Sequence, residues 1–312
     1  MLNNLEAYGF SADNISFDIK KIVQRSRNVA KQLSSGVSHL LKKNKVSVIM
    51  GSASLKRKSG DEFNIEVLQE DKKSLNLKSK NVIMATGARA KSLPNIIPDG
   101  KSIWTYKEAM VPTTLPKSIL VIGSGAIGIE FASFYNDLGV DITVVEVLDR
   151  ILPAEDIDIS NFALKSFEKQ GIKIKTSSTV KSLKTSKGKI SVQIETMAGL
   201  EEVSVEKVIL AVGIIGNTEN LGLENTSAKV SNGQLVVDKW GATHEPGLHA
   251  IGDLVGAPWL AHKASHEGVI CVERIAGLEN VHPLDSSNIP GCTYSRPQVA
   301  SVGLTQKLAE DA

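Results

Sequence analysis

The fold is predicted by the sequence Ser118-Ile-Leu-Val-Ile-Gly123-Ser124-Gly125-Ala126-Ile127-Gly128-Ile-Glu130. The apolar run before Gly123 is typical of a central parallel strand that is buried on both faces. Gly123 permits a sharp turn, Gly125 permits a pyrophosphate to approach the backbone closely, and Gly128 permits the following helix to pack against the strand. The first amides of that helix would point toward the phosphates. The stretch therefore predicts a strand, a phosphate-binding turn and a helix.

A second strand follows the helix and ends on an acidic residue. The segment Asp141-Ile-Thr-Val-Val leads to Glu146, eighteen residues after Gly128, where dinucleotide-binding units carry the acid that hydrogen-bonds the adenosine ribose. A carboxylate accepts from a 2′-hydroxyl but repels a 2′-phosphate, since charges about 4 Å apart interact by roughly 1 to 4 kcal/mol at surface-like dielectrics. Arg150 is the one arginine close behind this strand, so the sequence predicts NAD rather than NADP. A glycine-rich turn without a ligand is the alternative.

The length, charge and cysteine content of the chain exclude several classes of binding partner. The chain has 312 residues, enough for two domains, and its net charge of +2 does not favour nucleic acid. No apolar run is long enough to span a membrane, and the N-terminus has no signal-peptide pattern. Cys271 and Cys292 form neither a disulfide framework nor a CxxC redox or metal pair. We therefore expect core thiols, no metal site, no membrane or nucleic-acid partner, and a cytoplasmic location.

The remaining elements follow from apolar spacing. Asp18 is placed to cap a helix over residues 19–43, in which apolar residues recur at spacings of seven, four, four and three and give one apolar face. A second helix is expected over 157–170 and a third over 260–276. The expected strands, in chain order, are 46–50, 63–68, 74–77, 81–85, 172–175, 190–196, 201–205 and 207–212.

Six sequence motifs occur in an order and at spacings that match those of a known family. They occupy residues 83–88, 123–130 with Glu146, 211–213, 248–253, 260–264 and 294–303. The chain resembles the flavin-dependent pyridine nucleotide-disulfide oxidoreductases, most strongly the branch that oxidises dihydrolipoamide. The resemblance implies an α/β protein with two nested Rossmann-like domains, an NAD domain inserted in an incomplete FAD domain. The implied division is 1–115 (later part of the FAD domain), 116–240 (NAD domain), 241–288 (return of the FAD domain) and 289–312 (start of a truncated dimerisation or interface domain).

The resemblance also implies which residues bind each cofactor. The NAD residues would be Gly123, Ser124, Gly125, Ala126, Ile127, Gly128, Glu130, Glu146, Val180 and Gly213. The FAD residues would be Ala53, Ala85, Thr86, Gly87, Asp253, Trp259, Leu260, Ala261 and His262. Asp253 would hold a ribityl hydroxyl, the segment 260–262 would open a helix under the flavin, and Glu130 would lie beside the nicotinamide. Ala53 stands where the family often has a glycine near the adenine.

The departures from the family pattern concern the catalytic groups. The family begins with a second GxGxxG and a redox-active CxxxxC pair, and it ends with a His-Glu general base, but the sequence contains none of these. His266-Glu267 lies on the wrong helix to be that base. We therefore assign no catalytic residue, and the resemblance predicts a fragment of an enzyme that is cut at both ends.

The resemblance implies a reaction and partners for the complete enzyme. It would oxidise protein-bound dihydrolipoamide and pass electrons through a disulfide and FAD to NAD. Its partner would be a lipoyl-bearing protein of a 2-oxo acid dehydrogenase or glycine cleavage complex, and it would form a homodimer. The alternatives are another family member (a glutathione, trypanothione or mercuric reductase, or a soluble transhydrogenase), a non-catalytic protein that senses NADH, and a truncated product without function.

Overall fold

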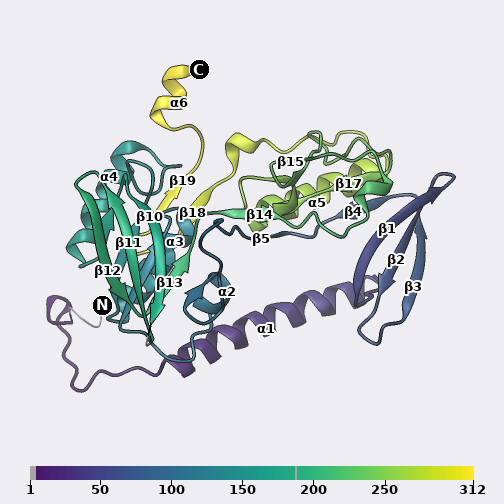
Figure 1. Cartoon of the computed structure of the whole chain (residues 1–312). Coiled ribbons are helices and arrows are strands. Elements are labelled where there is room, and N and C mark those ends of the chain that lie inside the picture. The colour runs from purple at the N-terminus through teal and green to yellow at the C-terminus, as the bar shows by residue number, and fades with distance from the viewer. Residues whose placement is uncertain (1–4, 187) are drawn as a thin grey trace.

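The computed structural model describes residues 5–186 and 188–312 and contains two bodies of strands and helices. Figure 1 shows one body around strands β10 to β13 with helices α3 and α4, and the other around β4, β17 and helix α5, with the long helix α1 running beside both. The α/β fold predicted from the sequence is confirmed.

The first body is organised around a five-stranded parallel sheet of order β6-β13-β7-β8-β9. The strands are β6 (Ile103–Trp104), β7 (Ser118–Ile122), β8 (Asp141–Val145), β9 (Lys173–Lys175) and β13 (Lys207–Leu210). The central strand β7 is buried on both faces, as its apolar run predicted. The edge strand β6 was not anticipated, because its two residues lie in a segment that the sequence marks as a connector.

The two faces of this sheet are covered by different structures. Helices α3 (Ala126–Asp137) and α4 (Ile157–Lys169) form one apolar core with Ile119 and Val121 of β7. The antiparallel strands β10 (Thr179–Ser186), β11 (Lys189–Thr196) and β12 (Gly199–Val205) form a second core with Leu120 and Ile122. The alternation follows from the period of two residues along a strand.

The second body has a shorter parallel pair at its centre. Strand β4 (Val82–Met84) pairs in parallel with β17 (Leu248–Ala250), and α5 (Ala261–Ile275) follows β17 through the 3-10 turn η4 (Gly252–Val255). A three-stranded antiparallel sheet of β1 (Ser52–Ser59), β2 (Glu62–Leu68) and β3 (Ser74–Ser79) extends from this body. The smaller pieces are β15 (Val230–Ser231), β16 (Gln234–Leu235), η3 (Leu223–Asn225) and η5 (Ser286–Asn288).

The chain passes from the second body to the first at β5 (Ala88–Ala90) and returns at β14 (Ile214–Gly216), and these two crossings are bonded to each other. Strand β5 on the way out pairs antiparallel with β14 on the way back. Thr86 Oγ1 donates to the Asn217 carbonyl at 2.8 Å, and Asn217 Nδ2 donates to the Thr86 carbonyl at 2.9 Å. The Arg89 guanidinium donates to both carboxylate oxygens of Glu219. These bonds fix one crossing against the other.

Helix α1 (Ile19–Lys43) has the predicted bounds, and the Asp18 carboxylate accepts from the Lys20 amide at 2.8 Å. Its apolar face is not buried, since Leu33, Val37 and Leu40 are all more than half exposed. The strand predicted over residues 46–50 is wrong. That segment is irregular and exposed, because no strand in the described part of the chain lies beside it to pair with its backbone.

The last segment returns to the first body. It contains the hairpin of β18 (Gly291–Thr293) and β19 (Val299–Ser301) and ends in α6 (Gln306–Asp311). Val299 packs in the same core as α3 and α4. The short elements α2 (Tyr106–Ala109) and η2 (Glu6–Tyr8) complete the structure. Among the helices of residues 5–186 and 188–312, none combines the length and the apolar character that crossing a membrane requires.

The packing of α3 on the turn after β7 predicts the effect of adding one methyl group. In Gly128→Ala the new Cβ would lie 2.0 Å from the Gly123 carbonyl oxygen, so the helix must move away from the turn. We expect a loss of about 1–3 kcal/mol in the free energy of unfolding, the usual cost of overpacking. Gly36→Ala on exposed α1, where the new Cβ meets open space, should instead gain about 1 kcal/mol or less. Urea titration measures both, and equal stability of the two variants would contradict the prediction.

Candidate functional site

The three glycines after β7 have three different surroundings. Gly123 has a φ of +99°, and a Cβ there would lie 2.3 Å from the Ala211 carbonyl oxygen. Gly128 is equally restricted, because it packs against the Gly123 carbonyl. Gly125 differs, since a Cβ at that position would have no atom within 4 Å. The turn is therefore fixed by close backbone packing on two sides and is open above Gly125.

Helix α3 begins directly at this opening. Gly125 is its N-cap residue, and no side chain accepts a hydrogen bond from its first amides. Ala126 and Ile127, the first two residues of the helix, are exposed. The first amides of a helix have no partner within the helix, so an anion above Gly125 would meet free donors and the positive end of the helix dipole.

Glu146 is held at the end of the neighbouring strand β8. It is 6% exposed, and its Oε2 accepts from the amide and the hydroxyl of Ser124 at 2.8 and 2.7 Å. Its Oε1 accepts from the Leu148 amide at 2.9 Å. A carboxylate has about four acceptor sites, so these three bonds orient Glu146 and leave it one further site. Ser124 joins the glycine turn to the acid.

Val180 and Gly213 lie at the same edge of the sheet. Strands β7, β8 and β13 are parallel, so the residues that follow each of them meet at one edge. Gly213 follows β13 with a φ of +101° and open space around it. The Ser178 amide donates to the Glu146 carbonyl at 2.9 Å, which ties the start of β10, with Val180, to the same place. The fold thus brings the glycine turn, Glu146, Val180 and Gly213 together.

Glu130 has a contact that the sequence did not indicate. Its Oε1 accepts from the Tyr294 amide at 2.8 Å. Two residues later, the Arg296 amide donates to Ser133 Oγ at 3.0 Å, and the Arg296 guanidinium pairs with Asp137. The segment 294–296 therefore runs along α3. Each partner occurs in a recognised motif, but nothing in the sequence shows that the two motifs touch.

The residues predicted for FAD gather in the second body, with one exception. Ala85, Thr86 and Gly87 follow β4, and Asp253 follows β17. The two strands are parallel neighbours, so both segments leave the same end of the pair. Trp259, Leu260, Ala261 and His262 open α5, whose N-cap Leu260 makes no side-chain cap. The exception is Ala53, which lies on β1 in the separate three-stranded sheet.

A largely buried ion pair next to the turn that carries Asp253 is not indicated by the sequence. Lys263 is 5% exposed, and its ammonium lies 3.0 Å from Glu267 Oε1 on the next turn of α5. The spacing of four residues between a lysine and a glutamate is visible in the sequence. It is commonly an exposed pair on a helix surface, so the burial could not be read from the pattern.

The cysteines lie on different elements and neither forms a disulfide. Cys271 is fully buried in α5, and Cys292 is half-buried on β18. Burial raises the pKa of the Cys271 thiol, and the nearby Asp238 carboxylate raises it further. Burial lowers the pKa of the neighbouring His249, which the same carboxylate opposes. A thiol with a raised pKa is a poor nucleophile, so Cys271 suits a core position.

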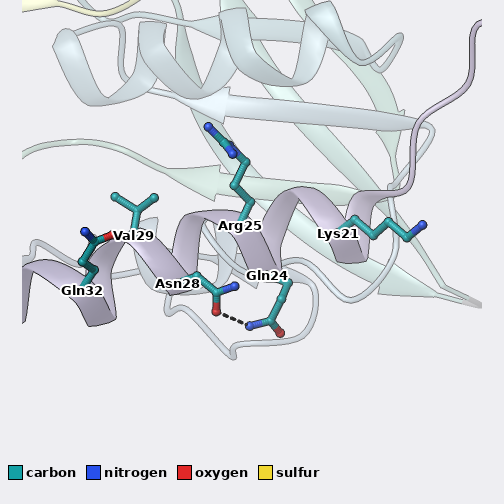
Figure 2. A pocket seen from close by; sticks show the side chains of 6 residues that line it. All are labelled: Lys21, Gln24, Arg25, Asn28, Val29 and Gln32. Carbon is teal, nitrogen blue, oxygen red and sulfur yellow. Dashed lines mark hydrogen bonds between the residues drawn. The ribbon is translucent and has the colours of Figure 1, made fainter.

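Two hollows lie on the surface of the described residues, and neither is lined by the glycine turn or by Asp253. A groove of about 380 Å³ runs along α1, but Figure 2 shows that its six lining side chains all project from that one helix, with Gln24 bonded to Asn28. A hollow of about 280 Å³ lies between α5, the segment 237–241 and the segment 284–289. Among residues 5–186 and 188–312 no cluster of three His, Cys, Asp or Glu side chains could hold a metal ion.

Comparison with known proteins identifies the family. The family model described as pyridine nucleotide-disulphide oxidoreductase matches residues 3–268. Proteins named dihydrolipoyl dehydrogenase from Rhizobium etli and Zymomonas mobilis are each 48% identical to the chain over 99% of its length. The chain covers 67% and 66% of those proteins, about two thirds of their length.

A solved structure supports the same assignment. The crystal structure of LpdA from Mycobacterium tuberculosis matches 99% of the chain with a TM-score of 0.91 and 28% identity, and the chain covers 66% of it. The flavoprotein disulfide reductase RclA of Escherichia coli has the same fold, with a TM-score of 0.83 and 23% identity. From the motifs, the fold and these similarities, we conclude that the chain belongs to the pyridine nucleotide-disulphide oxidoreductase family.

Proposed function

We propose that the chain is the cofactor-binding part of a dihydrolipoyl dehydrogenase, with NAD bound at the turn between β7 and α3 and FAD bound between β4, β17 and α5. The observation that carries the proposal is the arrangement at the edge of the parallel sheet. Glu146 is oriented by Ser124, and beside it the backbone is open above Gly125. Glu146 offers a carboxylate to a ribose, and the backbone above Gly125 offers amides to a pyrophosphate.

The surroundings of Glu146 support NAD over NADP. A 2′-phosphate beside Glu146 would meet a buried carboxylate, whose repulsion is screened less than that of an exposed group. The one nearby arginine, Arg150, donates to the Pro153 carbonyl at 3.3 Å and lies 3.5 Å from the Asp149 carboxylate. The terminal nitrogens of Arg150 are thus engaged with its own neighbours, and its Nε is buried without a hydrogen-bond partner, so the side chain is not arranged to receive a phosphate.

The groups of the second body support FAD at that end of the parallel pair. Gly87 has a φ of +68° with open space around it, so a planar or extended ligand could pass close to its backbone. Half-buried Asp253 offers a carboxylate for a hydroxyl. His262 Nε2 lies 2.9 Å from the Pro290 carbonyl, so its ring has a structural partner. The contribution of the segment 260–262 to flavin binding would therefore come from its backbone.

The chemistry divides between the cofactors and the chain. Bound FAD and NAD would supply the electron and hydride transfer. The glycine turn and the first amides of α3 would hold the pyrophosphate, and Glu146 would orient the adenosine. Glu130 would border the nicotinamide, with its carboxylate held by the Tyr294 amide. Asp253 and the start of α5 would fix the flavin. Binding and orientation are thus the roles that we assign to these residues.

The partners, the location and the domain limits extend the proposal. Dihydrolipoyl dehydrogenase activity would bring a lipoyl-bearing protein of a 2-oxo acid dehydrogenase or glycine cleavage complex to the chain, and the active enzyme would be a homodimer. The two free thiols suit a reducing cytoplasm. We keep the limits at residues 116 and 289. The predicted limit at 241 is moved back to the end of β14, because η3, β15 and β16 lie in the second body and Leu223 and Leu235 pack in its core. Strand β6 belongs to the sheet of the NAD domain although it lies before residue 116.

The cofactor preference tests the proposal directly. We expect NADH to bind more tightly than NADPH, and we expect Glu146→Gln to reduce this preference about tenfold, which corresponds to the loss of roughly 1.4 kcal/mol of repulsion and hydrogen bonding. Fluorescence titration with both cofactors measures it. Glu206→Gln is the matched control, because Glu206 accepts from the Lys117 amide at the opposite edge of the same sheet. Equal binding of NADPH by the unaltered chain would sink the proposal.

The positions of the cysteines predict that these 312 residues produce no NADH from dihydrolipoamide. The reaction needs a thiolate against the flavin and a base for the substrate thiol. Cys271 is buried with a raised thiol pKa, and Cys292 lies on a different element. Absorbance at the NADH band, with added FAD, should stay flat for the chain and for Cys271→Ser with Cys292→Ser. Turnover that disappears in the double variant would show that these thiols carry the reaction.

A further inference from the structure

The Lys263 ammonium is fully satisfied inside the second body. Besides Glu267, it donates to the Gly256 carbonyl at 2.9 Å and to the Gly252 carbonyl at 3.3 Å. An ammonium has three donors, and these acceptors match them one to one. Two of the three acceptors are carbonyls of η4 and the residue that follows it, so Lys263 joins the first turn of α5 to both ends of η4.

Glu267 completes the attachment from the next turn of the helix. Its Oε2 accepts from the Gly252 amide at 2.7 Å, while its Oε1 faces Lys263. Gly252 is therefore held by both of its backbone polar groups, its amide by Glu267 and its carbonyl by Lys263. Asp253, the proposed ribityl ligand, is the next residue along the chain.

The turn begins and ends on a glycine, so its shape depends on the bonds from α5. Gly252 has a φ of +75° and Gly256 a φ of +107°. Glycine loses more conformational freedom on ordering than any other residue, so a short turn between two glycines has little intrinsic stiffness. Bonds from a helix to both glycines supply the stiffness that the turn lacks.

Stability by itself does not account for a buried ion pair here. Taking the Lys263 ammonium and most of the Glu267 carboxylate out of water is costly, and well-packed apolar replacements of a buried pair are often neutral or stabilising. An apolar pair could fill the same volume, but it could not bond the amide of Gly252 or the carbonyls of Gly252 and Gly256. What the charged pair adds is orientation of the turn.

We propose that Lys263 and Glu267 are positioning residues that hold Asp253 at a fixed place relative to the N-terminal turn of α5, so that the ribityl chain and the flavin ring meet one prepared surface. The inference rests on the proposed function in taking Asp253 and the start of α5 as flavin contacts. A site that is ordered before binding does not lose that freedom when the ligand arrives. The pair therefore governs the affinity for flavin and leaves the NAD site in the other body unaffected.

The test replaces both charges with side chains of similar length. Lys263→Met with Glu267→Met removes every bond to the turn and leaves no unpaired charge. Dilute FAD titrated with the full chain and followed by flavin fluorescence gives its Kd even when binding is weak. We expect the Kd for FAD to rise about tenfold or more and the Kd for NADH to change by less than about twofold. The urea midpoint should fall modestly, because the Gly252 amide and the carbonyls of Gly252 and Gly256 lose their partners.

The matched control is a second ion pair of the same body. Lys58 lies 2.8 Å from Glu245, with both side chains mostly covered, and this pair has no bond to the turn 252–256. Lys58→Met with Glu245→Met should leave the Kd for FAD unchanged even if it alters stability. A change in the FAD Kd equal to that of the first double variant would assign both pairs a general structural role and overturn the proposal.

The remaining outcomes separate this inference from the proposed function. Unchanged FAD binding by Lys263→Met with Glu267→Met overturns the positioning role. A parallel loss of FAD and NADH affinity with a lowered urea midpoint also overturns it, because the pair would then act only through folding. An unaltered chain that binds NADH but no FAD removes the flavin role of the pair and leaves the NAD site standing. An unaltered chain that binds neither cofactor refutes the proposed function and this inference together.

Discussion

The burial of β7 on both faces is the constraint on which the rest of the structure depends. Ile119 and Val121 point into the core with α3 and α4, while Leu120 and Ile122 point into the core with β10, β11 and β12. A strand without a solvent face needs cover on both sides. The crossover helices provide it on one side and the antiparallel sheet on the other. Parallel pairing with β8 and β13 then brings the loops that follow these strands to a single edge, where the glycine turn and Glu146 meet.

The same principle recurs in the second body on a smaller scale. The parallel pair of β4 and β17 delivers residues 85–87 and Asp253 to one end, and a helix begins at that end in both bodies. The two bodies differ in what holds the turn after the parallel strand in place. Close backbone packing orders the turn in the first body, at Gly123 and Gly128. Side chains of α5 order it in the second body, through Lys263 and Glu267. The bonded crossings at Thr86 and Asn217 join the two arrangements.

Much of the fold followed from local patterns in the sequence. Periodicity or a capping residue predicted the bounds of α1, the buried strand β7, the helix after it and the antiparallel pair of β11 and β12. The third strand of that antiparallel sheet, β10, was not expected. The prediction of a strand over residues 46–50 was wrong, because an apolar, β-branched run forms a strand only where another strand lies beside it. Strand β6 was missed for the opposite reason. Its two residues carry no pattern, and they become a strand because β13 is available to pair with them.

The sequence by itself determined the dinucleotide-binding unit, since each glycine and the terminal acid has a local backbone or chemical reason to be where it is. It also determined which residues could serve as candidate ligands. Only the tertiary structure decided how those residues are held. The bonds from Ser124 to Glu146, from Tyr294 to Glu130 and from Glu267 to Gly252 join positions 22, 164 and 15 residues apart. Such contacts depend on how strands and helices pack, and the spacing of residues along a chain does not encode that packing directly.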